Sequence, residues 1–481
     1  MLLSELLAGD PVVTGEAQIL GLTADSRDVR PGYLFAALRG GQADGADFVG
    51  DALARGAAAV LADAGRDIAT GATPLIGADN PRRRLAQLAA RFHGPQPRVI
   101  AAVTGTSGKT SVADFTRQIW HSCGQRSASL GTLGVVGDGL DTRLPHTTPD
   151  PVTLHAALAD IAAAGVDHLA IEASSHGLDQ FRMDAVEVGA AGFTNLSQDH
   201  FDYHPTVDHY LRAKLRLFQV VMAPGGTAVL NVDVPEFSRL AQACRARGHK
   251  IVTYGTGPSD LHLAAIDPGR TITVDVAGGS HQVAFTLPGT YQALNALCAA
   301  GLAMASGITL DQALAAFARL KGVCGRVELV ARHASGAPVY VDYAHKPGAL
   351  EAVLATLRPL ANGRLVVVLG CGGDRDTAKR AIMGRVAASH ADRVFITDDN
   401  PRSENPAAIR REVLVGCPEA MEIGDRTEAI AAAVAGLEAG DVLVIAGKGH
   451  ESGQTIGDQV IPFDDAAVAR AAITTLGGES L

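Results

Sequence analysis

The chain has 481 residues, of which 47% are hydrophobic, 19% are charged and only 4% are aromatic. This composition supports packed cores in roughly three domains of ordinary size and excludes a disordered or collagen-like chain. The formal net charge of −10 argues against a general affinity for nucleic acid or for an anionic membrane surface.

The cysteines and the N-terminal residues indicate in which cellular compartment the protein is found. Six cysteines are scattered along the chain without a Cys-x-x-Cys pair, which favours buried thiols in a reducing compartment. The opening MLLSELLAGD lacks the basic segment of a secretory signal, and no apolar run approaches the roughly 20 residues of a membrane helix. We therefore expect a cytoplasmic protein that binds neither membranes nor nucleic acid.

Strands and helices alternate along three segments. The breaker cluster at 93–97 and the less marked one near 325–326 divide the chain into segments 1–96, 97–326 and 327–481. Helices are expected at 48–55 and 83–92 in the first segment, from the end of the loop at 104–111 to about 123 and at about 291–306 in the second, and at 349–357 and 378–389 in the third. Strands are expected at 99–103, 166–171, 339–343, 365–369, 394–397 and 442–446, with a β-rich stretch at 251–287. Regular alternation predicts an α/β fold, and in the third segment a parallel, doubly wound sheet.

A phosphate loop is predicted at residues 104–111, TGTSGKTS, between a strand and a helix. Glycines allow backbone N–H groups to converge on phosphate oxygens, Lys109 supplies a positive charge, and the Thr110 hydroxyl can bind magnesium. The general phosphate-loop pattern is G-x-x-x-x-G-K-[ST], and Val103 stands at the position of its first glycine. The flanking strand and helix nevertheless favour ATP binding.

Candidate metal ligands follow in the same segment. Glu172 stands at the carboxyl end of a buried strand, where ligands gather in open α/β sheets. The stretch 194–204 then places two Asp and two His within eleven residues. Triphosphate chemistry needs such groups to hold its metal ion.

Nine motifs occur in the order found in Mur ligases, and the chain most resembles the members that add diaminopimelate. The resemblance spans about residues 20–465 and includes TGTSGKTS, IEASSHGLDQFR, FTNLSQDHFDYH, YLRAK, GRVE, VDYAHKPGAL, GCGGDRD, DDNPRSENP and GKGHE. It implies a small α/β domain at 1–96 that binds the UDP substrate, and a central ATPase domain at 97–326 with a mainly parallel sheet. A Rossmann-like domain at 327–481 would bind the amino acid.

The resemblance also implies a reaction. ATP and Mg2+ would phosphorylate the D-glutamate carboxylate of UDP-N-acetylmuramoyl-L-alanyl-D-glutamate, and meso-diaminopimelate would attack the acyl phosphate. ADP and phosphate would be released, and the new amide would enter peptidoglycan synthesis. We expect a monomer with no macromolecular partner.

Residue roles follow from the matching motifs. Lys109, Lys214 and His200 are expected to be catalytic, with Lys214 carbamylated, although its helical position alone would predict an exposed lysine. The expected magnesium ligands are Thr110, Glu172, His200 and the carbamate of Lys214. The expected ATP-binding residues are Gly105, Thr106, Ser107, Gly108, Lys109, Thr110, Ser111, Asn295, Arg326 and Asp342. The expected UDP-substrate residues are Ser26, Gln42, Ala43, His146, Thr147, Thr148, Ser174, Gln180 and Arg182. The expected diaminopimelate residues are Arg375, Asp399, Asn400, Pro401, Arg402, Gly447 and Glu451.

The choice of amino acid depends mainly on Arg402. Diaminopimelate carries a distal carboxylate that lysine lacks, and a planar guanidinium can bind it through two parallel hydrogen bonds. A nearby Glu451 can accept from the distal ammonium. Two alternatives remain open: a lysine-adding or folate-polyglutamate-type ligase, and a nucleotide-binding regulatory module. Only a ligase would release ADP in response to an amine.

Overall fold

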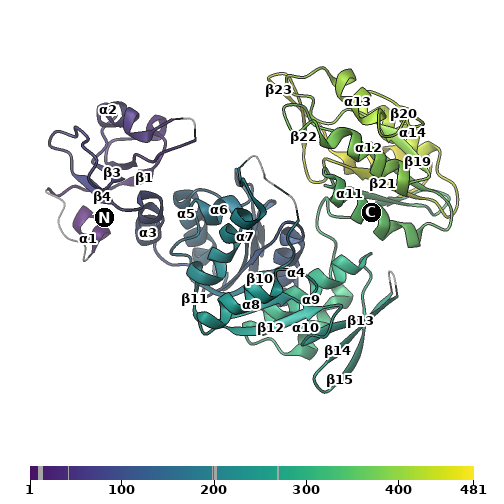
Figure 1. The fold of residues 1–481 in the computed structure, drawn as a ribbon, viewed down its shortest axis with the longest axis horizontal. Coiled ribbons are helices and arrows are strands. Elements are labelled where there is room, and N and C mark those ends of the chain that lie inside the picture. The colour runs from purple at the N-terminus through teal and green to yellow at the C-terminus, as the bar shows by residue number, and fades with distance from the viewer. Residues whose placement is uncertain (9–14, 42, 198, 200–202, 268–269) are drawn as a thin grey trace. The chain divides into compact units, whose positions relative to one another are not determined.

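The computed structural model describes residues 1–8, 15–41, 43–197, 199, 203–267 and 270–481. Its strands form three main sheets and a separate two-stranded hairpin. Figure 1 shows the fold, coloured from purple at the N-terminus to yellow at the C-terminus. Packing divides the chain into two compact units, of which the first contains residues 1–264, 274–281 and 294–317, and the second the rest. The expected α/β fold with three domains is confirmed, whereas the boundaries at 96 and 326 stay predictions.

The N-terminal sheet has four parallel strands that lie side by side in chain order. They are β1 (Gly21–Thr23), β2 (Tyr33–Ala36), β3 (Ala59–Asp63) and β4 (Leu75–Ala78). Its helices are α1 (Leu3–Leu7), α2 (Val49–Ala54) and α3 (Pro81–His93). Leu34 and Leu61 point to one face and Phe35 and Val60 to the other, because successive side chains of a strand alternate. Both faces are therefore apolar and covered.

The central sheet has eleven strands in the order β15-β14-β13-β12-β11-β10-β5-β9-β6-β7-β8. Their bounds are β5 (Val99–Thr104), β6 (Ser127–Gly131), β7 (Gly134–Gly137), β8 (Leu140–Thr142), β9 (His168–Glu172), β10 (Val188–Phe193), β11 (Met222–Asn231), β12 (Lys250–Gly255), β13 (Leu261–Asp267), β14 (Thr271–Val276) and β15 (Gly279–Ala284). The strands from β13 to β6 are parallel, and β7 and β8 are antiparallel additions. The expectation of a mainly parallel sheet is confirmed.

The helices that accompany this sheet among the described residues are α4 (Lys109–Ser122), α5 (Pro151–Ala163), α6 (Ser175–Asp179), α7 (Val207–Arg216), α8 (Phe237–Ala246), α9 (Thr290–Ala305) and α10 (Leu310–Ala316). The inner strands β5, β9 and β10 are buried on both faces, which explains their nearly continuous apolar sequences. Val103 pairs with Glu172 on one side and with Gly192 on the other. The loops that follow these three strands therefore leave the sheet at the same edge.

The C-terminal sheet has the order β20-β19-β18-β21-β17-β16-β24. Its strands are β16 (Glu328–Arg332), β17 (Pro338–Asp342), β18 (Leu365–Leu369), β19 (Arg393–Ile396), β20 (Met421–Glu422), β21 (Val442–Ala446) and β24 (Glu479–Ser480), and a separate hairpin joins β22 (Gly453–Ile456) to β23 (Gln459–Pro462). The five strands from β20 to β17 are parallel, as expected. The expectation of an entirely parallel sheet is wrong at one edge, where β16 and β24 run antiparallel. The short turn at 333–337 cannot form the crossover that a parallel β16 would need.

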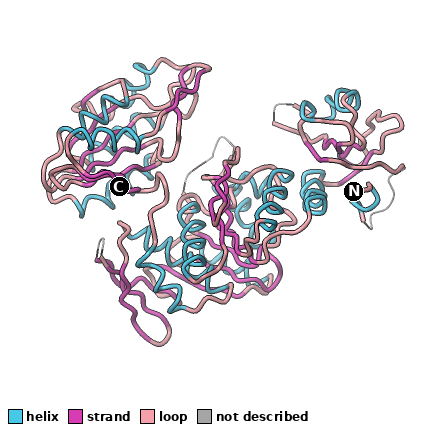
Figure 2. The backbone as a smooth tube through the Cα atoms, turned by 180° about the vertical axis from the view of Figure 1, so that it is seen from behind, coloured by secondary structure: helices cyan, strands magenta, loops and turns pink. Residues whose placement is uncertain are grey.

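Helices cover both faces of this C-terminal sheet (Figure 2). One face packs against α11 (Pro347–Leu357), α12 (Lys379–His390) and α13 (Pro406–Leu414). The other packs against α14 (Arg426–Ala435) and α15 (Asp465–Thr475), so the sheet is doubly wound. No helix in the described part of the chain combines the length and apolarity needed to cross a bilayer.

Candidate active site

The phosphate loop lies between β5 and α4. Gly105 and Gly108 have φ angles of +148° and +87°, which side chains rarely adopt. A Cβ atom at Gly105 would collide with the Thr194 hydroxyl, and one at Gly108 would lie 2.5 Å from Oδ1 of Asn295. The backbone can therefore pass close to these side chains, and α4 begins directly after the loop with its N-terminal end facing it. This is the geometry of an anion-binding loop.

Lys109 lies over the carbonyl groups of this loop. Its Nζ donates to the carbonyl oxygens of Gly105 at 2.9 Å and Thr106 at 2.8 Å. The loop after β10 also contacts the phosphate loop, because Asn195 Oδ1 accepts from the backbone N–H of Ser107 at 3.0 Å. The positive charge of Lys109 is therefore held at the mouth of the loop, while Ser111 is buried in α4.

Thr110 and Glu172 meet at the carboxyl edge of the sheet. The Thr110 hydroxyl donates to Glu172 Oε2 at 3.0 Å, and both residues are buried. The backbone N–H of Thr132 donates to the other carboxylate oxygen at 2.7 Å. A side chain at Gly131 would collide with the same carboxylate. Thr132 was not expected from the sequence, since nothing in its local pattern links it to Glu172.

Lys214 is buried beside the phosphate loop, with only 1% of its surface exposed. Its Nζ donates to the Gly105 carbonyl oxygen at 2.7 Å and lies 4.2 Å from the centre of the Tyr210 ring. The Tyr210 hydroxyl lies 3.3 Å from the Thr106 hydroxyl. The prediction of an exposed lysine from helical position alone is wrong, because this face of α7 packs inward. Tyr210 belongs to the YLRAK motif, but its contact with the loop was not expected.

The expected UDP-substrate residues of the central domain gather next to Glu172. The Thr148 hydroxyl donates to the Glu172 carbonyl oxygen at 2.8 Å and accepts from the N–H of Ser174 at 3.0 Å. Arg182 donates to the Thr148 carbonyl oxygen at 2.7 Å and to Gln180 Oε1 at 3.1 and 2.8 Å. The hydroxyl of Thr147 lies 3.0 Å from that of Thr132. These side chains therefore form one polar surface that continues from the Glu172 carboxylate.

The remaining residues that were expected to bind the UDP substrate or magnesium are Ser26, Gln42, Ala43, His146 and His200. Ser26 begins a short 3-10 helix after β1, and Ala43 lies in the loop after β2, so both follow the carboxyl ends of neighbouring parallel strands. His146 is exposed in the loop before Thr147. Gln42 and His200 lie outside the described residues. Among the residues that are described, no group of three or more His, Cys, Asp or Glu side chains is arranged to hold a metal ion.

The expected ATP residues are divided between the two units. Asn295 contacts the phosphate loop in the first unit, whereas Arg326 and Asp342 belong to the second. The Arg326 guanidinium lies 4.5 Å from the centre of the Tyr343 ring. Asp342 accepts from the N–H groups of Val327 at 2.8 Å and Ala344 at 2.7 Å. Burial nevertheless raises the pKa of Asp342 to about 6.

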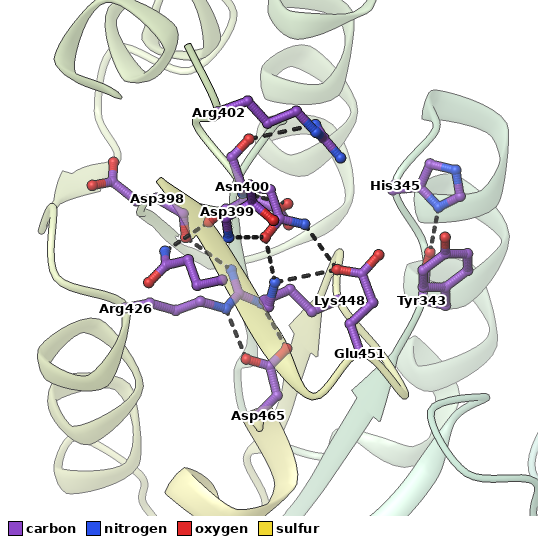
Figure 3. A network of polar contacts seen from close by, with 12 residues as sticks. Tyr343, His345, Asp398, Asp399, Asn400, Arg402, Arg426, Lys448, Glu451 and Asp465 are labelled. Atoms are coloured by element: carbon purple, nitrogen blue, oxygen red, sulfur yellow. Dashed lines mark hydrogen bonds and ion pairs between the residues drawn. The ribbon is translucent and has the colours of Figure 1, made fainter. Parts of the chain in front are cut away.

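The expected diaminopimelate residues lie in loops that follow β18, β19 and β21 (Figure 3). Arg402 Nη1 donates to the Gly373 carbonyl oxygen at 2.7 Å, and Asn400 Nδ2 donates to Glu451 Oε2 at 2.8 Å. Arg402 and Asp374 both have φ angles near +50°, a strained conformation for residues other than glycine. Such strain is characteristic of functional loops, because the surrounding structure must hold it in place.

The remaining expected members of this group lie on the same loops. The Gly447 N–H donates to the Asp342 carbonyl oxygen at 3.1 Å, and the Asp399 carbonyl oxygen accepts from Gln454 at 2.6 Å. Pro401 follows Asn400 directly, and the Arg375 side chain, in the exposed loop after β18, donates to the Asp374 carbonyl oxygen at 3.1 Å. The structure therefore brings Asp399, Asn400, Arg402 and Glu451 together, although Glu451 lies about 50 residues further along the chain.

A buried ion pair lies beneath these loops (Figure 3). Arg426 binds Asp465 through two hydrogen bonds of 2.7 Å, and neither side chain is exposed. Arg426 also donates to the Ala446 carbonyl oxygen at 3.0 Å, the last residue of β21. The pair thus ties α14 and α15 to the strand end that precedes Gly447.

A phosphate loop and a separate charged cluster on a second α/β unit are the two features expected of an ATP-dependent ligase. Three family models match the chain: the Mur ligase catalytic domain at residues 18–93, the Mur ligase middle domain at 103–303 and the Mur ligase glutamate ligase domain at 325–449. The chain belongs to the Mur ligase family.

Individual relatives agree with this assignment. The chain is 50% identical over 474 residues to the UDP-N-acetylmuramoyl-L-alanyl-D-glutamate--2,6-diaminopimelate ligase of Mesorhizobium japonicum, with 98% of each chain covered. A solved structure of a ligase with the same name is 34% identical, with a TM-score of 0.71 and 95% of each chain covered. A folylpolyglutamate synthase of Mycobacterium tuberculosis, solved with ADP, is 20% identical, with a TM-score of 0.63 over 83% of this chain and 95% of that one. This last likeness is one of fold.

Proposed function

We propose that this protein joins meso-diaminopimelate to UDP-N-acetylmuramoyl-L-alanyl-D-glutamate, using ATP and passing through an acyl phosphate. The observation that carries the proposal is that Arg402 and Glu451, from separate loops, both contact Asn400: Arg402 Nη1 donates to its carbonyl oxygen at 3.5 Å, and Glu451 Oε2 accepts from its amide at 2.8 Å. A guanidinium and a carboxylate suit the distal carboxylate and ammonium of diaminopimelate. The names of the relatives support the same substrates.

The first step is the transfer of the γ-phosphoryl group to the D-glutamate carboxylate. This transfer brings two anions together, so it needs positive charge and N–H donors at the phosphates. Lys109 and the backbone N–H groups at the start of α4 would supply them. Thr148, Gln180 and Arg182 would orient the peptide end of the UDP substrate, since they form the polar surface next to Glu172.

A magnesium ion fits the donors at this edge. The Thr110 hydroxyl and the Glu172 carboxylate are adjacent oxygen donors, the type that Mg2+ prefers. We propose that Thr110 and Glu172 hold Mg2+ together with His200 and a carbamate formed on Lys214, which lies at the same loop. When bound, the ion would neutralise charge on the phosphates.

The second step is attack by the amine of diaminopimelate. Its nitrogen forms a bond to the acyl carbon, the bond from that carbon to the phosphate oxygen breaks, and inorganic phosphate leaves. The ammonium must lose a proton before or during attack. We place this reaction in the cytoplasm, which agrees with the finding that the six cysteines, all within the described residues, form no disulfide.

The test measures ADP release by the purified protein with the UDP-muramoyl dipeptide and either meso-diaminopimelate or L-lysine. Wild-type protein is expected to release ADP with diaminopimelate and far less with lysine. Arg402→Ala is expected to raise the KM for diaminopimelate by about 100-fold, as expected for loss of a bidentate ion pair, and to leave the KM for ATP unchanged.

Two results would overturn the proposal. Equal turnover with lysine would favour the lysine-adding alternative, and ADP release that ignores both amines would favour a regulatory module. Arg470→Ala is a matched control, because Arg470 forms its ion pair with Glu328 elsewhere in the same unit. This control variant is expected to keep both KM values.

A further inference from the structure

A further charged side chain, that of Lys448, lies in the diaminopimelate cluster, and it is not among the residues that the motifs predicted for this site. Lys448 follows Gly447 after β21, and none of its side chain is exposed. Its Nζ donates to Asn400 Oδ1 at 2.9 Å and to Glu451 Oε2 at 3.2 Å. Figure 3 shows these contacts as dashed lines that meet at the Lys448 ammonium.

Burying an ammonium group has a large desolvation cost, which must be offset by well-placed acceptors. Here one of the two acceptors is a carboxylate whose side chain is 33% exposed, so Glu451 lies between the buried lysine and solvent. The other acceptor, Asn400, uses its amide N–H to bind the same Glu451 oxygen at 2.8 Å. Two donors from two loops thus hold a single carboxylate oxygen.

The two oxygens of Glu451 are therefore not equivalent. Both Lys448 and Asn400 donate to Oε2, whereas Oε1 accepts no hydrogen bond from any described residue. A carboxylate held by one oxygen presents the other in a defined direction. The backbone N–H of Thr455 also donates to Asn400 Oδ1, at 3.0 Å, which fixes the amide that assists Lys448.

We propose that Lys448 is a positioning residue for the incoming amino acid. It holds Glu451 Oε2 and thereby directs Oε1 toward the distal ammonium of diaminopimelate. This inference rests on the proposed function and adds a residue that does not touch the substrate. Lys448 acts through Glu451, so its contribution depends on the Glu451 carboxylate.

A purely structural role makes different predictions. Lys448 also links the loop after β21 to the loop after β19, and loss of that link would affect every ligand of the unit. If Lys448 acts through Glu451, only diaminopimelate binding changes. The two roles therefore differ in which substrates show a changed KM. They also differ in whether substitutions at Lys448 and Glu451 have additive effects on the KM for diaminopimelate.

The experiment compares Lys448→Met, Lys448→Gln, Glu451→Gln and the double variant Lys448→Met/Glu451→Gln in the full-length protein. ADP release is measured against diaminopimelate, ATP and the UDP substrate. Lys448→Met is expected to raise the KM for diaminopimelate about 10- to 100-fold, the usual effect of removing a partner that orients a ligand group. The KM values for the other two substrates are expected to stay within about twofold of wild type.

Non-additivity and partial rescue give two further readouts. The double variant is expected to bind diaminopimelate no more weakly than Glu451→Gln alone, because Lys448 acts through that carboxylate. Lys448→Gln keeps an uncharged NH2 donor group and is expected to recover part of the loss. Arg364→Met is the matched control, since Arg364 pairs with Asp441 at the opposite, amino-terminal edge of the same sheet. It is expected to keep all three KM values.

The inference is overturned if Lys448→Met raises the KM for ATP as much as that for diaminopimelate, or if its effect adds to that of Glu451→Gln. Circular dichroism and a melting curve identify a variant that fails to fold, and Lys448→Gln then carries the comparison. Failure of the proposed function would be visible separately, as wild-type protein that releases no ADP in response to diaminopimelate.

Discussion

Lys109 and Lys214 donate to the same carbonyl oxygen, that of Gly105, although they are about 100 residues apart in the chain. The two Nζ atoms lie 2.9 and 2.7 Å from this oxygen. Two ammonium groups on one acceptor repel each other, while the Tyr210 ring, 4.2 Å from Lys214, attracts the second one. Conversion of Lys214 to a carbamate would replace this repulsion by attraction to Lys109.

Carbamylation of Lys214 predicts dependence on carbon dioxide. Removing dissolved CO2 is expected to lower the kcat of wild-type protein, and bicarbonate is expected to restore it, because an anionic oxygen ligand forms only from the carbamate. Lys214→Glu carries a permanent carboxylate and is expected to retain weak activity that ignores bicarbonate. A wild-type rate that is the same with and without bicarbonate would argue against the modification. ADP release under nitrogen, before and after bicarbonate addition, is the measurement.

Gly108→Ala is expected to abolish nucleotide binding. The substitution combines an unfavourable positive φ angle, costing about 1–2 kcal/mol, with a Cβ atom 2.5 Å from Asn295 Oδ1. Gly124→Ala is the matched control, since its φ of +79° carries the same backbone penalty but nothing lies within 4 Å of its Cβ atom. Titration with ADP compares the two. If both variants bind ADP equally well, the close packing at Gly108 has no role in the site.

His155 is expected to contribute to acid sensitivity. Burial lowers the pKa of His155 from 6.5 to about 4, and the side chain is 2% exposed. Between these two values the unfolded chain binds a proton that the folded chain does not, so the free energy of unfolding decreases as the pH falls from 6.5 to 4. One such site contributes a slope of at most about 1.4 kcal/mol per pH unit.

His155→Leu removes this contribution and is expected to make the pH dependence of unfolding shallower by about one proton. Urea titrations at several pH values between 4.5 and 7 measure it. The fluorescence of Trp120 is a suitable probe, because it is the single tryptophan of the chain and is fully buried in α4. An unchanged slope would mean that His155 is protonated in the folded protein.

The pair of Arg426 and Asp465 is expected to matter for stability. Arg426→Met leaves a buried carboxylate without its partner and is expected to cost about 3–5 kcal/mol of unfolding free energy. The double variant Arg426→Met/Asp465→Leu removes both charges and is expected to recover most of this loss. Urea unfolding followed by circular dichroism checks both. A double variant as unstable as the single one would show that the hydrogen bond to Ala446, and not the charge pair, stabilises this region.

Local sequence predicted most of the fold and one part of the site. Strand, glycine-rich turn and helix start are consecutive between residues 99 and 123, so the phosphate loop is visible in one short stretch. The strands at 365–369 and 442–446 were predicted with their observed bounds, because strands buried on both faces are continuous apolar runs. The antiparallel addition of β24 was not predicted, because it pairs with β16 between residues far apart in the chain, Ala331 and Ser480.

The family resemblance named residues, but it could not say which of them are in contact. Lys214 reaches Gly105 across 109 residues, and Asn400 reaches Glu451 across 51. Helix and strand periodicity predicts only which residues close together in the chain share a face. It therefore predicted an exposed Lys214, and it gave no indication of the contacts of Thr132 or Lys448. By itself the sequence determined the order of the elements and the local loop that binds phosphate. Only the tertiary structure, through the order of strands in each sheet, decided which charges are buried together, because hydrogen bonds depend on distance in space.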